Sequence, residues 1–417
     1  MTENKTIPKK TALISVITPD FSDAEASFDE LKELVTTAGG EPTLFFSQKR
    51  DSLHPKTCIG QGKLEEIKAV CAFEEIEAVI FDLELTPVQQ SWLEKFFEIS
   101  VFDRTMVILE IFAQRAVSYE GKLQVELARL NFMLPRLKGS YEGLSRLGGG
   151  GGGGAGARRG AGESKLDLDK RYIRQRILLL KREIKQIQSR RDETRARRRK
   201  NGIVSVAIAG YTNSGKSTLL NTLTDAGVLS KDMLFATLDP TSKRLTLPNG
   251  REVLLTDTVG FIRRLPHQLI EAFKSTLEEV ALADLVLLIC DISDPDCSEQ
   301  ISVSKRIIEE IGYHGEILHV FNKVDLVHAN SVMPGSIMIS AKEQTGLEQL
   351  LLRIQKMLFP QNEIVSLKIP YEESSFYFSV KQKYRLLEDF TDENGYIVKV
   401  EVNIADLARF EPYRINA

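Results

Sequence analysis

The segment "GYTNSGKS" at residues 210–217 has the residue types and spacing of a phosphate-binding loop. It follows the apolar run "IVSVAIA", expected to be a strand, and precedes "STLLNTLTD", expected to be a helix. A GxxxxGK[ST] loop in this context directs backbone N–H groups and a helix N-terminus at phosphate oxygens. Lys216 is then placed to pair with the β- and γ-phosphates, and the Ser217 hydroxyl to ligate Mg²⁺. The loop alone predicts a nucleoside triphosphate site without naming the base.

A later strand end, "LLTDTVG", carries the spacing DxxG at Asp257 and Gly260. We expect Asp257 to hold Mg²⁺ through water and the Gly260 amide to sense the γ-phosphate. The intervening "FATLDPTSKR" must supply a hydroxyl ligand for Mg²⁺, in a segment that the γ-phosphate orders. Thr237 is the first choice for this ligand and Thr241 the second. The predicted catalytic residues are Lys216, Thr237 and Gly260, and the predicted Mg²⁺ ligands are Ser217, Thr237 and Asp257.

Two further strand ends indicate that the base is guanine. "HVFNKVD" places Asp325 where its carboxylate can accept guanine N1–H and N2–H₂, which adenine does not offer. "MISAK" places the Ala341 amide where it can meet guanine O6. Four motifs in this order favour a GTPase over an ATPase or an inactive loop. The residues predicted to bind GTP or GDP are Gly210, Tyr211, Thr212, Asn213, Ser214, Gly215, Lys216, Ser217, Thr218, Phe235, Ala236, Thr237, Leu238, Asp257, Thr258, Val259, Gly260, Asn322, Lys323, Asp325, Ser340, Ala341 and Lys342.

Two residues of these motifs bear on the rate of hydrolysis. Many small GTPases carry a glutamine directly after DxxG that orients the attacking water, and this chain has Phe261. Phenylalanine cannot orient water by hydrogen bonding, so we expect slow intrinsic turnover and a missing group supplied by a partner or an ion. Asn213 either resembles the asparagine of potassium-dependent GTPases, where K⁺ replaces an arginine finger, or braces the loop.

Composition limits the class of protein. The 417 residues, 42% of them hydrophobic and 27% charged, are enough for two or three globular domains. No apolar run is long enough to cross a membrane, and the first residues lack the apolar core of a secretory signal. The four cysteines show no metal-like spacing, so we expect a cytoplasmic protein with reduced thiols. Between residues 158 and 200, 17 Lys and Arg face 6 Asp and Glu, which indicates contact with a polyanion.

Two leucine and isoleucine stripes flank seven consecutive glycines. Residues 123–137 and 166–187 carry apolar side chains at alternating spacings of three and four, a pattern that zips two helices into an antiparallel hairpin. Pro135 is expected to kink or end the first helix near its last turn. The glycine-rich stretch 146–162 is then either a flexible tether or the tip of a rigid arm. As a tip it presents the predicted RNA-binding residues Arg146, Arg158 and Arg159. The basic run 190–200 is either a solvated linker or a second surface for phosphates.

The whole chain is predicted to be an α/β multidomain protein. Residues 1–115 alternate strands ("TALISVI", "EAVIFDL", "ISVFD") with helices and suggest a parallel α/β domain. Residues 116–200 form the helical arm, 201–360 the P-loop GTPase domain, and 361–417 a small α+β domain. The last is expected to run strand, helix, turn, strand, helix, with no evident catalytic residues.

The chain resembles the HflX family of the Obg–HflX group of GTPases. The matching residues are "GYTNSGKSTLLNTLT", "FATLDPT", the glycine-rich loop before "GES", and "DTVGFIRRLPHQLIEAFKSTLEEV". The last is the most diagnostic, because GTPase chemistry does not require "LPHQLIEAF". The arm loop departs from the family pattern GxxGxRGPGET, since "ARRGAGES" has Ala161 in place of proline.

The resemblance implies a protein that binds the large (50S) ribosomal subunit and its rRNA. Its arm would reach toward the peptidyl-transferase region, and it would split stalled 70S ribosomes in a GTP-dependent way. The resemblance thus favours the tip over the tether. The family is also reported to bind ATP through its N-terminal domain, for which residues 10–115 carry no motif. We expect a monomer that does not bind DNA.

Three alternatives stay open at this point. The chain could be a 50S assembly GTPase, or an adaptor in which GTP only sets the affinity for rRNA. It could also be an RNA-modifying enzyme with a regulatory GTPase domain, although no second catalytic constellation supports this.

Overall fold

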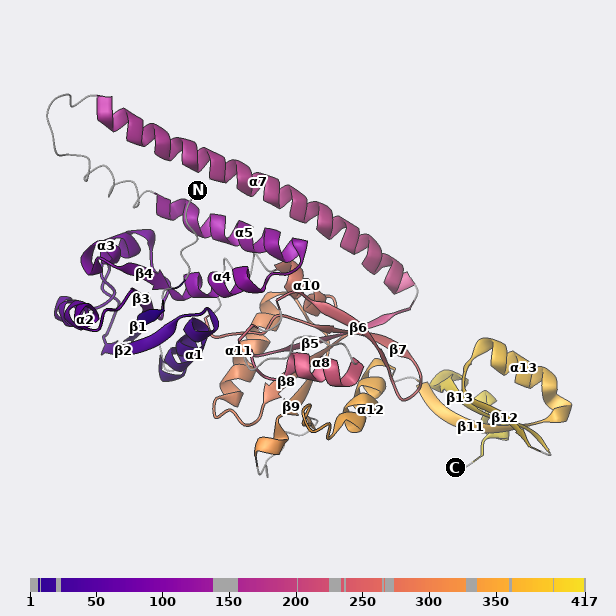
Figure 1. Cartoon of the computed structure of the whole chain (residues 1–417). Coiled ribbons are helices and arrows are strands. Elements are labelled where there is room, and N and C mark those ends of the chain that lie inside the picture. Colours follow the sequence, from indigo (N-terminus) through magenta and orange to yellow (C-terminus); the bar gives the residue numbers. More distant parts are fainter. Residues whose placement is uncertain are drawn as a thin grey trace.

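The computed structural model describes residues 7, 9–19, 24–137, 157–200, 202–224, 234–235, 238–264, 266, 274–327, 336–359, 362–392 and 394–415. Three sheets and a helical hairpin follow one another along the chain (Figure 1). The predicted α/β multidomain fold with a helical arm is confirmed.

The first sheet is parallel, with the strand order β2-β1-β3-β4. Its strands are β1 (Lys10–Ile17), β2 (Glu41–Lys49), β3 (Ala78–Phe81) and β4 (Ser100–Asp103), and they alternate with α1 (Ala24–Thr37), α2 (Gln61–Phe73), α3 (Pro87–Phe97) and α4 (Arg104–Arg115). Side chains of α1 and α4 bury one face of the sheet, and those of α2 and α3 bury the other. The sequence analysis did not identify β2, because this edge strand "EPTLFFSQK" is only half-buried and lacks a continuous apolar run.

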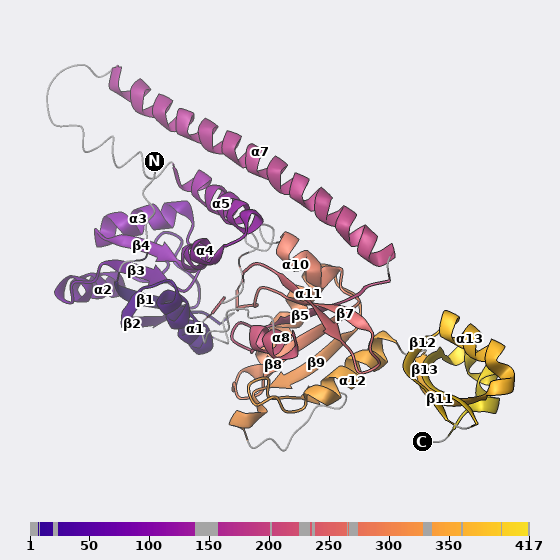
Figure 2. The ribbon, with the colours of Figure 1, turned by 45° about the vertical axis from the view of Figure 1, so that its right-hand side comes forward.

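The arm is an antiparallel pair of helices. α5 (Tyr119–Met133) passes into a short 3₁₀ turn, η1 (Leu134–Arg136), and α7 (Ala157–Lys200) returns beside it. Their seam buries Leu123, Leu127, Ile177, Leu180 and Ile184, with Leu130, Leu134, Ile173 and Ile187 partly buried around them. This confirms the predicted hairpin, and α5 ends just before Pro135 as expected. At 44 residues α7 is about 65 Å long, so it runs alongside α5 and on past the second sheet (Figures 1 and 2).

One prediction about the arm was wrong in part, and one alternative left open for residues 190–200 is excluded. The glycine-rich loop was expected to extend to residue 162, but α7 already begins at Ala157. The run 190–200 is not a linker, because it forms the last turns of α7. There Arg195 forms ion pairs with Glu278 at 3.3 Å and Glu279 at 2.7 Å, both on α10 (Lys274–Ala281). The base of the arm is therefore bound to the second sheet's helical layer.

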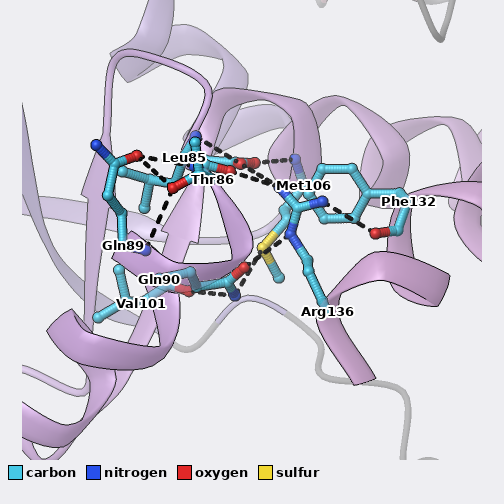
Figure 3. Close-up of polar contacts among 9 residues, drawn as sticks. Leu85, Thr86, Gln89, Gln90, Val101, Met106, Phe132 and Arg136 are labelled. Atoms are coloured by element: carbon cyan, nitrogen blue, oxygen red, sulfur yellow. Dashed lines mark hydrogen bonds and ion pairs between the residues drawn. The ribbon is translucent and has the colours of Figure 1, made fainter. Parts of the chain in front are cut away.

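Arg136, just after the C-terminal end of α5, fixes the arm to the first sheet (Figure 3). Its guanidinium donates to the Leu85 carbonyl at 2.7 Å and to the Gln90 side chain at 2.9 Å, and it lies 3.3 Å from the centroid of the Phe132 ring. It also pairs with Asp103 at 3.3 Å. Burial raises the pKa of Asp103 to about 6, and Arg136 opposes this shift. The end of α5 is thus held by charge, hydrogen bonds and a cation–π contact together.

The second sheet has the order β10-β9-β8-β5-β7-β6, in which only β6 is antiparallel to its neighbour. The strands are β5 (Val204–Gly210), β6 (Thr241–Thr246), β7 (Glu252–Asp257), β8 (Leu285–Asp291), β9 (Ile317–Asn322) and β10 (Ile337–Met338); the other helices are α8 (Lys216–Thr224), α11 (Cys297–Glu310) and α12 (Leu347–Leu358). Apolar clusters lie on both of its faces. The carboxyl ends of its parallel strands therefore meet along one edge, where ligands bind in folds of this kind.

The third sheet is small and antiparallel, with the order β11-β13-β12. It comprises β11 (Asn362–Pro370), β12 (Arg385–Asp392) and β13 (Gly395–Asn403), with α13 (Ser374–Lys383) packed on it. The expected element order was wrong in two respects. β12 was missed because five of its eight residues are exposed and four are charged, and the final helix is a 3₁₀ helix, η4 (Ile404–Arg409).

A search of the described helices found none that is both long and apolar enough to span a membrane.

The buried seam between α5 and α7 predicts how much the stability of the arm depends on a single side chain. Leu180 is fully buried between the helices, whereas its neighbour Leu179 is 48% exposed. We expect Leu180→Ala to lower the free energy of opening the arm by about 2–4 kcal/mol, because it leaves a cavity that the helices fill only in part. Hydrogen exchange of the α5 and α7 amides measures this quantity, and Leu179→Ala is the matched control. Equal effects of the two substitutions would contradict the seam.

Candidate nucleotide site

The phosphate-binding loop connects β5 to α8 in a conformation that two glycines permit. Gly215 has φ +92°, and a Cβ there would overlap the Asn322 amide nitrogen. Gly210 has φ +147°, and a Cβ there would overlap the Ile289 carbonyl oxygen. Between them Asn213 has φ +61°. The loop thus makes a tight turn against the ends of β8 and β9, with the first turn of α8 directly behind it.

Three polar side chains of the loop, those of Thr212, Ser214 and Lys216, are buried but only partly satisfied. Lys216 is 6% exposed and donates to the Tyr211 carbonyl at 2.5 Å. Burial lowers the pKa of Lys216 to about 8, while the nearby Asp257 opposes the shift. The hydroxyls of Thr212 and Ser214 are buried and have no hydrogen-bond partner among the described residues. Buried polar groups in this state indicate a ligand with many hydrogen-bonding atoms, as a polyphosphate has.

Two of the three predicted Mg²⁺ ligands, Ser217 and Asp257, come together at the end of β7. The Ser217 hydroxyl donates to a carboxylate oxygen of Asp257 at 2.7 Å, and both residues are oxygen donors of the kind that Mg²⁺ prefers. Thr241 is paired with Asp257 in the β6–β7 register, so β6 begins beside this site. Thr237, the expected third ligand, and Ala236 lie outside the described residues. The donor set present fits Mg²⁺.

The base-recognition motifs meet at the ends of β9 and β10. The Asn322 side chain donates to the Ser214 carbonyl at 2.9 Å and accepts from the Ala341 amide at 2.9 Å. The Ser340 hydroxyl bonds to Asp325 and lowers the pKa of that carboxyl. Asn322 therefore connects the phosphate loop to the two segments predicted to recognise guanine. Lys323 pairs with Asp291 at 2.7 Å, and Lys342 is exposed.

Phe261 and Gly260 lie against the phosphate loop. The Phe261 amide donates to the Gly210 carbonyl at 3.0 Å, and its carbonyl accepts from the Thr212 amide at 2.8 Å. The Phe261 ring is 1% exposed and belongs to an apolar cluster of the second sheet. A Cβ at Gly260 would come within 3.0 Å of the Lys216 ammonium. Gly260 is thus next to Lys216, and the Phe261 side chain is buried in the core.

The side chains of three residues predicted to bind nucleotide lie in an apolar core instead. Phe235, Leu238 and Val259 are buried in the apolar cluster under α1 and α4 of the first sheet. Phe235 packs edge-on against Phe112 of α4, with ring centroids 4.7 Å apart. Only the backbones of these three residues are therefore left for the nucleotide. Thr258 is buried and donates to the Ile208 carbonyl, and Thr218 lies on α8.

A buried ionic network that the sequence analysis missed connects Tyr211 to the first sheet. The Tyr211 hydroxyl donates to Glu30 of α1 and accepts from the Arg263 amide at 2.7 Å. Arg104 of α4 donates to Glu30, to Asp82 at 2.8 Å and to the Arg263 carbonyl at 3.2 Å. Burial raises the pKa of Glu30 and of Asp82, and Arg104 opposes both shifts. The only signals in the sequence were a charged residue on the apolar face of α1 and an arginine directly after a buried strand.

The fold and the site together define a P-loop GTPase: a phosphate loop at the carboxyl edge of a mainly parallel sheet, next to a guanine-type motif on the adjacent strands. Three family models match successive parts of the chain. They are described as GTP-binding GTPase N-terminal (residues 25–113), GTP-binding GTPase Middle Region (115–198) and 50S ribosome-binding GTPase (205–323).

Whole-chain relatives are called GTPase HflX. The chain is 46% identical to that of Caldanaerobacter subterraneus over 94% of its length and 91% of the relative. It is 36% identical to that of Escherichia coli, over 96% and 95% of the two chains. A crystal structure of a GTP-binding protein from Sulfolobus solfataricus with GDP is 28% identical, has a TM-score of 0.44, and covers 84% of this chain and 99% of that one. The chain belongs to the HflX family and is a GTPase.

Base recognition gives a test of the site. Because an amide donates where a carboxylate accepts, we expect Asp325→Asn to weaken GDP binding by about 100-fold or more. The same change should strengthen binding of xanthosine diphosphate, which offers an acceptor at the position of the guanine amino group. Fluorescence titration with labelled nucleotides measures both affinities. Glu343→Gln, an exposed carboxylate in the turn after β10, is the control, and an equal loss for both bases would contradict the assignment.

Proposed function

We propose that this GTPase binds the large ribosomal subunit through its arm and splits or rescues stalled ribosomes. The observation that carries the proposal is a basic outer face on α7, on a rigid hairpin whose base contacts the GTPase sheet. Arg171, Arg174, Arg182 and Lys185 are exposed and lie away from the seam side chains. None of the four forms an ion pair with a described residue. Over about 21 Å of helix they present charge suited to a nucleic-acid backbone.

Acidic residues do not neutralise this face. Glu183 is the only Asp or Glu between residues 170 and 191, and its carboxylate accepts from Tyr119 of α5 at 2.8 Å. It therefore points toward the partner helix and not toward the basic face. The tip residues Arg146, Arg158 and Arg159 stay proposed RNA contacts, since their side chains lie outside the described residues.

At the nucleotide site we propose the following roles. The amides of the phosphate loop and the Lys216 ammonium bind the β- and γ-phosphates, and the Gly260 amide, next to Lys216, contacts the γ-phosphate. Ser217, Asp257 and Thr237 hold Mg²⁺, which supplies charge to neutralise the phosphate oxygens. Asp325 and the Ala341 amide select guanine, with Asn322 bracing them against the loop.

Phe261 supports a dependence on an outside group. Its ring is buried, and its backbone holds the phosphate loop, so it cannot orient the attacking water. We propose that the ribosome or a monovalent cation completes the site. The left-handed backbone of Asn213 turns the loop at the place where K⁺ would bind. A protein that acts on ribosomes in this way would be located in the cytoplasm. A role in 50S assembly, or as an adaptor without turnover, is distinguished by the test below.

The test is steady-state GTP hydrolysis in K⁺ and in Na⁺, each with and without purified 50S subunits. We expect low turnover without ribosomes and an increase of about 10-fold or more with 50S, because charge stabilisation by a missing group is worth at least this much. A further rise in K⁺ alone would identify Asn213 as a cation ligand. Bound GTP with no rise under any condition would favour the adaptor.

The basic face gives a second test. We expect the combined change of Arg171, Arg174, Arg182 and Lys185 to Gln to weaken 50S binding and to reduce the slope of log affinity against log salt by up to about 3, since each phosphate contact contributes about 0.7–0.9. Lys63→Gln with Lys68→Gln on α2 is the control, because it removes charge far from the arm. An unchanged slope in the α7 variant would exclude this face as the docking surface.

A further inference from the structure

We infer that Asp239 is a positioning residue that connects the switch segment to the base of the arm. The switch segment is the stretch 235–241, which carries Thr237, the proposed Mg²⁺ ligand. Asp239 follows Thr237 by two residues and lies next to α5, the first helix of the arm. Its carboxylate accepts from the backbone amides of Val117 at 3.0 Å and Ser118 at 2.7 Å. The Ser118 hydroxyl donates to the other carboxylate oxygen.

These hydrogen bonds are made at a helix N-terminus. Ser118 is the N-cap of α5, and its hydroxyl oxygen accepts from the Gly121 amide at 2.9 Å. A carboxylate at this end of a helix is stabilised by the unpaired amides and by the helix dipole. Gly121 leaves the room for it, since a Cβ there would overlap a carboxylate oxygen of Asp239. The switch segment thus completes the cap of the arm's first helix.

The same segment is anchored at two further residues, one before and one after Thr237 in the sequence. Phe235 and Leu238 are each 2% exposed, within the apolar cluster of the first sheet. After Asp239 the chain enters β6, where Thr241 pairs with Asp257 beside the proposed metal site. Phe235, Leu238 and Asp239, which flank Thr237 in the sequence, are therefore all held by the first sheet or by the arm. With these residues held, less of the segment has to be ordered when GTP and Mg²⁺ bind.

Two consequences follow from this connection. Releasing Asp239 removes an anchor of the switch, so GTP binding weakens while GDP binding, which needs no switch contact, does not. By thermodynamic reciprocity, GTP binding in turn stabilises the cap of α5. Neither consequence requires a ribosome, so the test below can fail or succeed independently of the proposed ribosomal function.

The experiment uses the full chain with Mg²⁺ and compares a non-hydrolysable GTP analogue with GDP. We expect Asp239→Ala to weaken the GTP analogue by about 5–100-fold and to leave GDP unchanged. Gly121→Ala should act in the same direction, because its methyl group displaces the carboxylate although alanine is the better helix former. Tyr119→Phe, which removes only the hydrogen bond to Glu183 within the arm, should leave the ratio of the two affinities unchanged.

Hydrogen exchange supplies a readout that a merely structural cap would not move. In the wild-type chain, the GTP analogue should slow exchange of the amides at residues 117–122, and in Asp239→Ala this response should be lost. Equal loss of GTP and GDP affinity, or an unchanged ratio in both Asp239→Ala and Gly121→Ala, would overturn the inference. An exchange rate at 117–122 that ignores the nucleotide in the wild-type chain would overturn it as well.

Discussion

Arg104 is a buried charge on which the attachment of the GTPase site to the first sheet depends. Its side chain is 3% exposed and lies between two carboxylates, Asp82 and Glu30, and the Arg263 carbonyl. An ion without these partners would cost several kcal/mol in such surroundings. The network therefore forms only when α1, α4 and the segment after DxxG are all in place. In this arrangement it holds the three elements together through one set of buried contacts.

The apolar core also attaches residues of the GTPase motifs to the first sheet. One continuous cluster contains Leu31 and Phe112 of the first sheet's helices together with Phe235, Leu238 and Ile262 from the GTPase motifs. Phe235 and Leu238, which flank the threonine proposed to bind Mg²⁺, and Ile262 after DxxG are thus core residues of another part of the fold. A GTPase whose switches moved freely would expose this cluster to water, at about 25 cal/mol for each Å² of apolar surface. Nucleotide-dependent movement of the switches must therefore involve the first sheet or the arm.

The sequence was sufficient to predict features that arise from local patterns. The phosphate loop, the strand ends that carry Asp257 and Asn322, the arm seam and the end of α5 before Pro135 all depend on spacings within about one or two elements. The missed features depend on pairs far apart in the chain, such as Tyr211 with Glu30, or Arg195 with Glu279. Edge strands β2 and β12 were missed for a related reason. Their alternation is weak because one neighbour, and so half of the burial, is absent.

The end of α7 and the start of α5 are both connected to segments of the GTPase motifs. α7 ends at Lys200 and β5, which leads directly into the phosphate loop, begins at Val204. The last turns of α7 are bound to α10, the helix after DxxG, through Arg195. α5 begins where Asp239 of the switch segment accepts its amides. Because the seam packs the two helices together, a displacement of the arm would move the start of β5, α10 and Asp239 together. A single flexible tether in the same place could hold a partner close, but it could not couple these three elements.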